Sequence, residues 1–163
     1  MVKQSSSALA KAKKSAAGLM SSPAFRRTEE DTLILNGLGC YFASLFRAAL
    51  CYSLFQNTGD KQIAAEGLKF YRRALESWSA MSVEAKSVYI SDVSYGSTPN
   101  RRGHWMDRIP EIEKDVAALE QYFASANVPN TGVNAIALIS VPRSRANYKA
   151  SHTSALAFHP GRR

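Results

Sequence analysis

The sequence predicts an all-α protein whose principal helices, about three in number, form a helical hairpin or a small bundle. This prediction rests on apolar residues that recur at steps of three and four in three separate segments. The chain has 163 residues, of which 45% are hydrophobic and 21% charged, a composition typical of one globular domain. We expect a basic Ser/Ala/Lys-rich leader over residues 1–22, a helical domain over 23–126, and a linker with a basic, irregular tail over 127–163.

The first predicted helix covers residues 25–57. Gly37 and Gly39 each cost about 1 kcal/mol relative to alanine inside a helix, so they either permit close contact with a neighbouring helix or mark a break. Gly59 is expected to end the helix, because glycine accepts the left-handed conformation of a helix terminus. The predicted apolar face consists of Ile34, Leu38, Tyr41, Phe42, Leu45, Phe46, Ala49, Leu50 and Leu54.

The second predicted helix covers residues 61–81. Gly67, Tyr71 and Ala74 fall at the spacing found in the second helix of a tetratricopeptide repeat. One such unit is visible and the preceding helix does not keep the register, so a repeat array is not predicted. The apolar face of this helix consists of Ile63, Gly67, Leu68, Tyr71, Ala74, Leu75 and Trp78.

The third predicted helix begins at Ile109, with Pro110 suited to its first turn. Its apolar face alternates steps of three and four through Ile109, Ile112, Val116, Leu119 and Phe123. Before it, we expect a short helical turn over residues 82–88 and a short extended run over 89–95. After it, we expect a linker over 127–134 and a short C-terminal strand over 135–141.

The net charge of +8 is concentrated at the two ends of the chain. Residues 1–27 and 132–163 contain 11 of the 21 basic residues and no acid, whereas residues 28–131 have a net charge of −3. The helical domain therefore offers no basic face, and specific binding of nucleic acid is not expected. We predict solvated tails, with contact to an anionic surface as an alternative that high salt would abolish.

The two cysteines and the N-terminus restrict the class of protein. Cys40 and Cys51 would lie ~16 Å apart on one helix, too far for a disulfide, and both are predicted to be small buried residues. The chain lacks the Cys/His spacing of a zinc site, and no metal or cofactor is predicted. We see neither a signal peptide nor a run of ~20 apolar residues that would span a membrane, so the default localisation is cytoplasmic.

The loop over residues 100–108 holds the candidate ligand-binding residues Arg102, His104, Trp105, Asp107 and Arg108. An indole can stack on a sugar ring while arginine and aspartate bind hydroxyl groups, and an imidazole can act as acid, base or ligand. The structural alternative is favoured here. Trp105 would then fill the helix junction, and His104 and Asp107 would cap helix ends. We therefore predict no catalytic residue.

Four segments of the chain, taken in order, resemble a helical module found in large bacterial multidomain proteins. They are residues 21–27 (SSPAFRR), 37–43 (GLGCYFA), 58–60 (TGD) and 102–110 (RGHWMDRIP). The resemblance covers about residues 20–125, and it links the chain to exported proteins that process carbohydrate. Residues 152–161 (HTSALAFHPG) are similar to the entry of a following β-rich domain. The resemblance implies that this chain is a fragment whose catalytic domain lies elsewhere.

The predicted function is therefore that of a non-catalytic helical accessory or scaffold module from a larger bacterial protein that acts on carbohydrate. Its partners would be neighbouring domains, another protein or a carbohydrate. Two other classes are left open. The first is a stand-alone interaction module with a tetratricopeptide-like groove, and the second is a small enzyme centred on His104.

Overall fold

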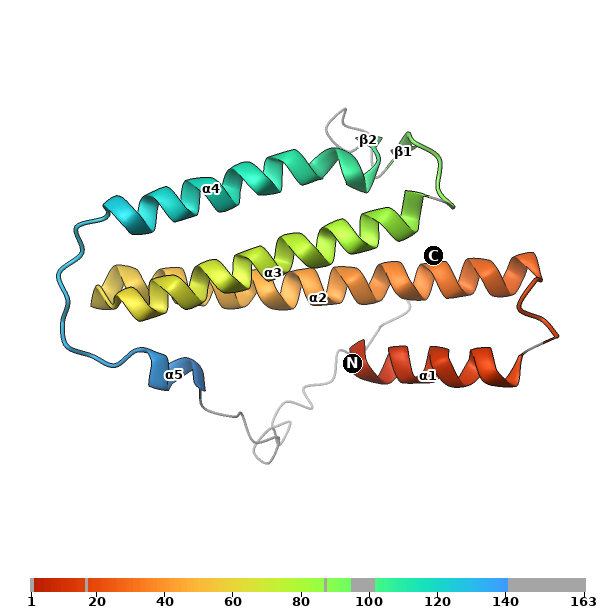
Figure 1. Ribbon diagram of the computed structural model, residues 1–163, viewed down its shortest axis with the longest axis horizontal. Helices are drawn as coiled ribbons and strands as arrows, with labels where there is room; N and C mark the ends of the chain where they lie inside the picture. The colour runs from red at the N-terminus through yellow and green to blue at the C-terminus, as the bar shows by residue number, and fades with distance from the viewer. Residues whose placement is uncertain (1, 17, 87, 95–101, 141–163) are drawn as a thin grey trace, which may run out of the picture.

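The computed structural model describes residues 2–16, 18–86, 88–94 and 102–140, and these are mainly helical, which confirms the all-α prediction. Figure 1 shows α4 above α3, α3 beside α2, and both α1 and α5 along the other side of α2. Two very short strands and a 3-10 helix connect α3 to α4. The elements are α1 (Val2–Ser15), α2 (Pro23–Thr58), α3 (Lys61–Lys86), β1 (Val93–Ser94), β2 (Arg102–Gly103), η2 (Trp105–Arg108), α4 (Ile109–Ser125) and α5 (Ile136–Ser140).

The turn between α2 and α3 lies where the sequence predicts it. Gly59 has a φ of 65°, and its N–H donates to the carbonyl of Phe55 at 2.8 Å, which ends α2. Asp60 Oδ1 then accepts the N–H of Gln62 at 2.9 Å at the start of α3. The short connection makes α2 and α3 neighbours in space.

Gly37 lies at a point of close approach between α2 and α3. A Cβ atom at this position would lie 2.5 Å from Cβ of Met81. Of the two roles left open for this glycine, the structure shows close helix contact, and α2 continues without a break. The small buried residues Ser44, Ala48 and Ala74 occupy the same pair of helices.

Two separate clusters form the core, one at each end of the helix pair. The first joins α2, α3, α4 and the segment before α5, and Phe55 meets Phe123 edge-to-face at 5.1 Å between ring centroids. The second brings Trp78, Tyr89 and Trp105 against a smaller buried group. The buried members are Cys51, Phe55, Ile63, Ala64, Phe123 and Ala135 in the first cluster and Ile34, Met81 and Ala85 in the second.

The N-terminal segment departs from the predicted irregular tail, because residues 2–15 form α1. Ser5 Oγ donates to Asn36 of α2, and Lys13 forms an ion pair with Glu29 of α2. Val2, Ser5, Leu9 and Lys13 are half-buried at helical spacing and form the side that faces α2. This contact explains why a sequence of serine, alanine and lysine is ordered as a helix.

The C-terminal strand prediction is wrong, because residues 136–140 form α5. Asn134 Oδ1 accepts the N–H of Ala137 at 3.4 Å at the start of this helix. Ile136 and Ile139, three residues apart, both pack against the first core cluster. A short apolar run fits a buried strand or a helix equally well, and here the packing selects the helix. Residues 141–163 lie outside the described part of the chain.

The segment between α3 and α4 also differs in detail from the prediction. The expected helical turn over residues 82–88 is a continuation of α3 to Lys86. Of the extended run over residues 89–95, only Val93 and Ser94 are in a strand, and Tyr95 is outside the described residues.

The predicted apolar face of α2 is wrong in part. The structure instead buries Ser44, Ala48, Cys51 and Phe55, whereas Phe46 is 70% exposed. Because α2 is apolar on nearly every side, the helical period alone could not identify the side that packs. Cys40 is also exposed, contrary to prediction, although both cysteines are free as expected. The predicted residues that prove exposed are Phe42, Phe46, Ala49 and Leu50.

We expect Gly37→Val to lower the free energy of unfolding by about 1–3 kcal/mol, because the added atoms would overlap Met81 and force α2 away from α3. Urea denaturation measures this change. Gly39→Val is the matched control in the same helix, since a Cβ atom there meets only Cγ2 of Val2. Equal losses in the two variants would contradict this explanation.

Candidate functional site

The loop that carries the candidate ligand-binding residues joins a short strand pair to α4. β1 and β2 pair antiparallel, with Val93 opposite Gly103 and Ser94 opposite Arg102. Gly103 has a φ of 107°, and a Cβ atom there would lie 2.7 Å from Oδ2 of Asp107. Glycine is therefore required where the chain turns from β2 into η2.

His104 and Asp107 form a capping box at the start of η2. The N–H of Met106 donates to Nδ1 of His104 at 3.1 Å, and the N–H of His104 donates to Oδ2 of Asp107 at 2.7 Å. These bonds satisfy two backbone donors at the first turn. Asp107 thus contacts the backbone of His104, not its imidazole ring.

His104 is 7% exposed. Its Nε2 atom has no hydrogen-bond partner among the residues that the structure describes. Within these residues, no three His, Cys, Asp or Glu side chains lie together in a way that could hold a metal ion. The described contacts therefore position His104 as a helix cap.

Trp105 connects the loop to α3. Its carbonyl accepts the indole N–H of Trp78 at 2.8 Å, and its ring meets Tyr89 edge-to-face at 5.3 Å between centroids. The centroid of the His104 ring lies 5.4 Å from the centroid of the same indole. Trp105 therefore occupies the junction of α3 and η2, where these rings leave it half-buried.

The two candidate arginines lie at the edges of the loop. Arg102 is exposed and forms an ion pair with Asp92, and the hydrogen bond to Asp92 raises the pKa of its guanidinium. Arg108 is half-buried and precedes the first residue of α4. The structure thus brings all five predicted residues into one loop, and it shows the contacts that hold four of them.

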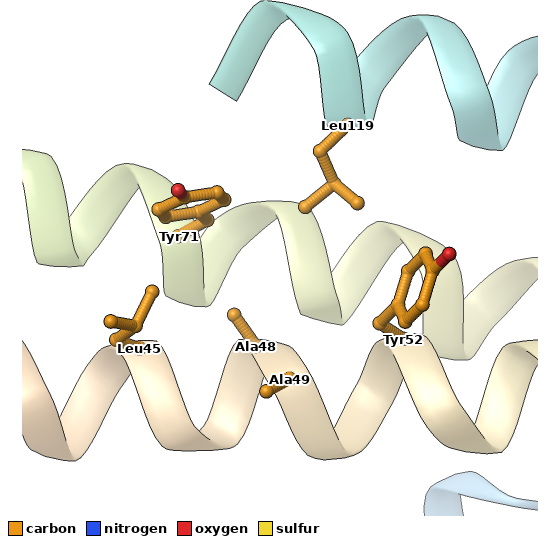
Figure 2. A pocket seen from close by; sticks show the side chains of 6 residues that line it. All are labelled: Leu45, Ala48, Ala49, Tyr52, Tyr71 and Leu119. Carbon is orange, nitrogen blue, oxygen red and sulfur yellow. The ribbon is translucent and has the colours of Figure 1, made fainter. Parts of the chain in front are cut away.

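A separate hollow, which the sequence did not predict, lies between α2, α3 and α4. We call it the α2/α4 groove, and it has a volume of about 280 Å³. Figure 2 shows Leu119 of α4 pointing toward α2, where Ala48 and Ala49 lie between Leu45 and Tyr52. The lining residues are Leu45, Ala48, Ala49, Tyr52, Tyr71 and Leu119. The pair Ala48 and Ala49, which lies between larger residues in the sequence, could have indicated this hollow, because alanine side chains are too small to fill the space.

Tyr71 connects the wall of the α2/α4 groove to α4. Its hydroxyl donates to Oδ2 of Asp115 at 3.3 Å. Burial, followed by the nearby charge of Asp115, raises the pKa of Tyr71 to about 12. Arg72 and Glu120 form a second link between α3 and α4 at 3.0 Å. These polar contacts hold α4 beside α3 at the rim of the groove.

Among the described helices, α2 is long enough and apolar enough to cross a membrane, by length and composition only. Only 17% of its most apolar part is buried. Its apolar side chains therefore extend well beyond the core.

Comparisons with protein-family models, curated proteins and solved structures found no match to this chain. The resemblance to a module of bacterial multidomain proteins therefore stays a prediction. The class that the structure defines is a small, mainly helical protein with an apolar groove and a capped loop.

We expect Asp107→Ala to lower the free energy of unfolding by about 0.5–2 kcal/mol, because the N–H of His104 would lose its cap. Thermal unfolding followed by tryptophan fluorescence measures the change at the Trp105 junction. Arg102→Ala is the control, because an exposed ion pair contributes about 0–1 kcal/mol. A loss in Asp107→Ala no larger than in Arg102→Ala would contradict the capping role.

We expect stability to fall as the pH rises from about 10 toward 12, partly through Tyr71. Its phenol ionises near pH 10 in an unfolded chain but at about 12 in the folded one, so ionisation favours unfolding in this window. Urea denaturation at several alkaline pH values should show a shallower loss for Tyr71→Phe than for the unaltered chain. Identical pH dependence would show that Tyr71 is not responsible.

Proposed function

We propose that this protein is a non-catalytic helical module that binds an apolar segment of a protein partner in the α2/α4 groove. The observation that carries the proposal is a hollow lined by leucine, alanine and tyrosine side chains from three helices. The partner is either a neighbouring domain of a larger protein or a separate protein. In both cases the module acts as a scaffold.

The groove has room for apolar side chains. Its volume of about 280 Å³ is close to the lower limit of about 300 Å³ for small-molecule pockets. A cavity of about 150 Å³ already holds a benzene molecule. The α2/α4 groove is therefore matched to one or two apolar side chains, such as those that a partner helix presents at a spacing of three or four residues.

Polar groups at the rim are suited to orienting such a segment. The hydroxyl of Tyr71 lies against Asp115, and the hydroxyl of Tyr52 accepts the side-chain N–H of Gln56 at 2.9 Å. A few polar groups around an apolar floor are typical of binding grooves, because they fix the orientation of what binds.

The contacts of the loop after β2 support a non-catalytic assignment. The hydrogen bonds of His104 and Asp107 are made within the capping box, and Arg102 is paired with Asp92. Carbohydrate binding at Trp105 stays a prediction. The indole of Trp105 already contacts the rings of Tyr89 and His104, which leaves less of its surface for a sugar.

A library of displayed helical peptides, selected against the folded full chain, tests the groove. We expect selected peptides to carry apolar residues three or four positions apart. Ala49→Trp, which fills the groove, should weaken their binding at least tenfold, as measured by fluorescence anisotropy.

Val83→Trp is the matched control, because Val83 is 62% exposed on α3 and does not line the groove. Peptides that bind Ala49→Trp as tightly as the unaltered chain would contradict the proposal. Oligosaccharide binding by calorimetry that is lost in Trp105→Ala would favour the carbohydrate alternative.

A further inference from the structure

The side of α2 that faces away from α3 is apolar, and no other described segment covers it. Leu35, Phe42, Phe46 and Leu50 are 67%, 46%, 70% and 49% exposed, respectively. Steps of seven, four and four residues place them on one side of the helix, along ~22 Å of its length. The rings of Phe42 and Phe46 stack at 6.1 Å between centroids. We call these four residues the outer α2 face.

The outer α2 face is free of charge along its length. Between Thr32 and Thr58, α2 carries one charged residue, Arg47. The guanidinium of Arg47 lies 5.7 Å from the ring centroid of Phe70 in α3, away from the outer α2 face. A continuous uncharged surface of this kind is typical of a site that contacts a membrane or another macromolecule.

A basic helix lies directly beside the outer α2 face. α1 carries Lys3, Lys11, Lys13 and Lys14 and no acidic residue. It runs antiparallel to α2, since Val2 lies against Gly39 and Lys13 pairs with Glu29. Because Gly39 is four residues from Leu35, α1 borders the exposed apolar strip.

Charge is distributed unequally between the two sides of the molecule. α4 carries four acidic residues and one basic residue, and Figure 1 shows it on the opposite side from α1 and α5. α5 and the segment over residues 127–135 that leads to it contain no charged residue. α1 is therefore positive and α5 neutral, with Lys13 of α1 paired to Glu29 near the start of α2, whereas α4 on the far side is negative.

We infer that the outer α2 face and α1 together bind an anionic lipid surface. Phenylalanine and leucine side chains insert at the boundary between headgroups and acyl chains, while lysines attract anionic headgroups. The surface is distinct from the α2/α4 groove, so this inference does not depend on the proposed function.

A second copy of the chain fits this surface less well. The four side chains expose on the order of 500 Å², whereas a stable dimer covers about 800 Å² on each partner. A two-fold dimer through this face would also bring two α1 helices, each with four lysines, to one interface. Repulsion between them would oppose association, whereas an anionic surface neutralises the same charges.

Cosedimentation of the full chain with vesicles tests the inference. We expect binding to vesicles of phosphatidylcholine and phosphatidylglycerol at a ratio of three to one, and at least tenfold weaker binding to phosphatidylcholine alone. Phe42→Ser with Phe46→Ser should weaken binding to anionic vesicles at least tenfold. Exchange of Lys3, Lys11 and Lys14 for glutamine should remove the preference for anionic lipid, as should high salt.

Two controls separate this surface from the rest of the molecule. Val83→Ser removes an exposed apolar side chain from α3, and Leu119→Ala alters the α2/α4 groove; both should leave vesicle binding unchanged. Circular dichroism confirms that each variant is folded.

Two results would overturn the inference. One is vesicle binding that is equal for neutral and anionic lipid or unaffected by the double phenylalanine exchange. The other is a dimer in sedimentation without lipid that the same exchange dissociates, which would assign the outer α2 face to a second copy.

Discussion

Small residues bring α2 and α3 into close contact, and α1, α4, α5 and η2 pack on this helix pair. Gly37 leaves room for Met81 at one end, and Gly67 leaves room for Cys51 near the other, where an added Cβ would lie 2.9 Å from Cβ of Cys51. Because the two helices lie so close together, little backbone is exposed between them. Two small clusters of buried side chains then form the core. Other large side chains of α2, such as Phe42 and Phe46, point away from α3.

This arrangement separates structural polar groups from apolar binding surfaces. The side chains of His104 and Asp107 accept backbone N–H groups of their own turn, because the backbone donors at a buried helix start must be satisfied. The α2/α4 groove and the outer α2 face instead present apolar groups that no described element covers. Uncovered apolar surface, and not a cluster of reactive side chains, therefore supports the functional proposals.

Much of the fold, but only part of the candidate site, is predictable from the sequence. The capped loop was foreseen as a structural element, since glycine, histidine and aspartate at those spacings favour a turn before a helix. The α2/α4 groove was missed, because Ala48, Tyr71 and Leu119 lie far apart in sequence and the space between them exists only after packing. The apolar face of α2 was misassigned. Apolar residues occur on nearly every side of this helix, so their spacing does not identify the side that packs against α3.

The helical class, the turn at Gly59 and the start of α4 at Ile109 follow from local sequence, because such signals depend on a few neighbouring residues. The helices at residues 2–15 and 136–140 and the buried side of α2 do not follow from local sequence. These outcomes depend on contacts between distant segments. A segment with a weak helix preference forms a helix when one of its sides packs against a neighbouring helix. The sequence of the segment alone does not show whether such a neighbour is present.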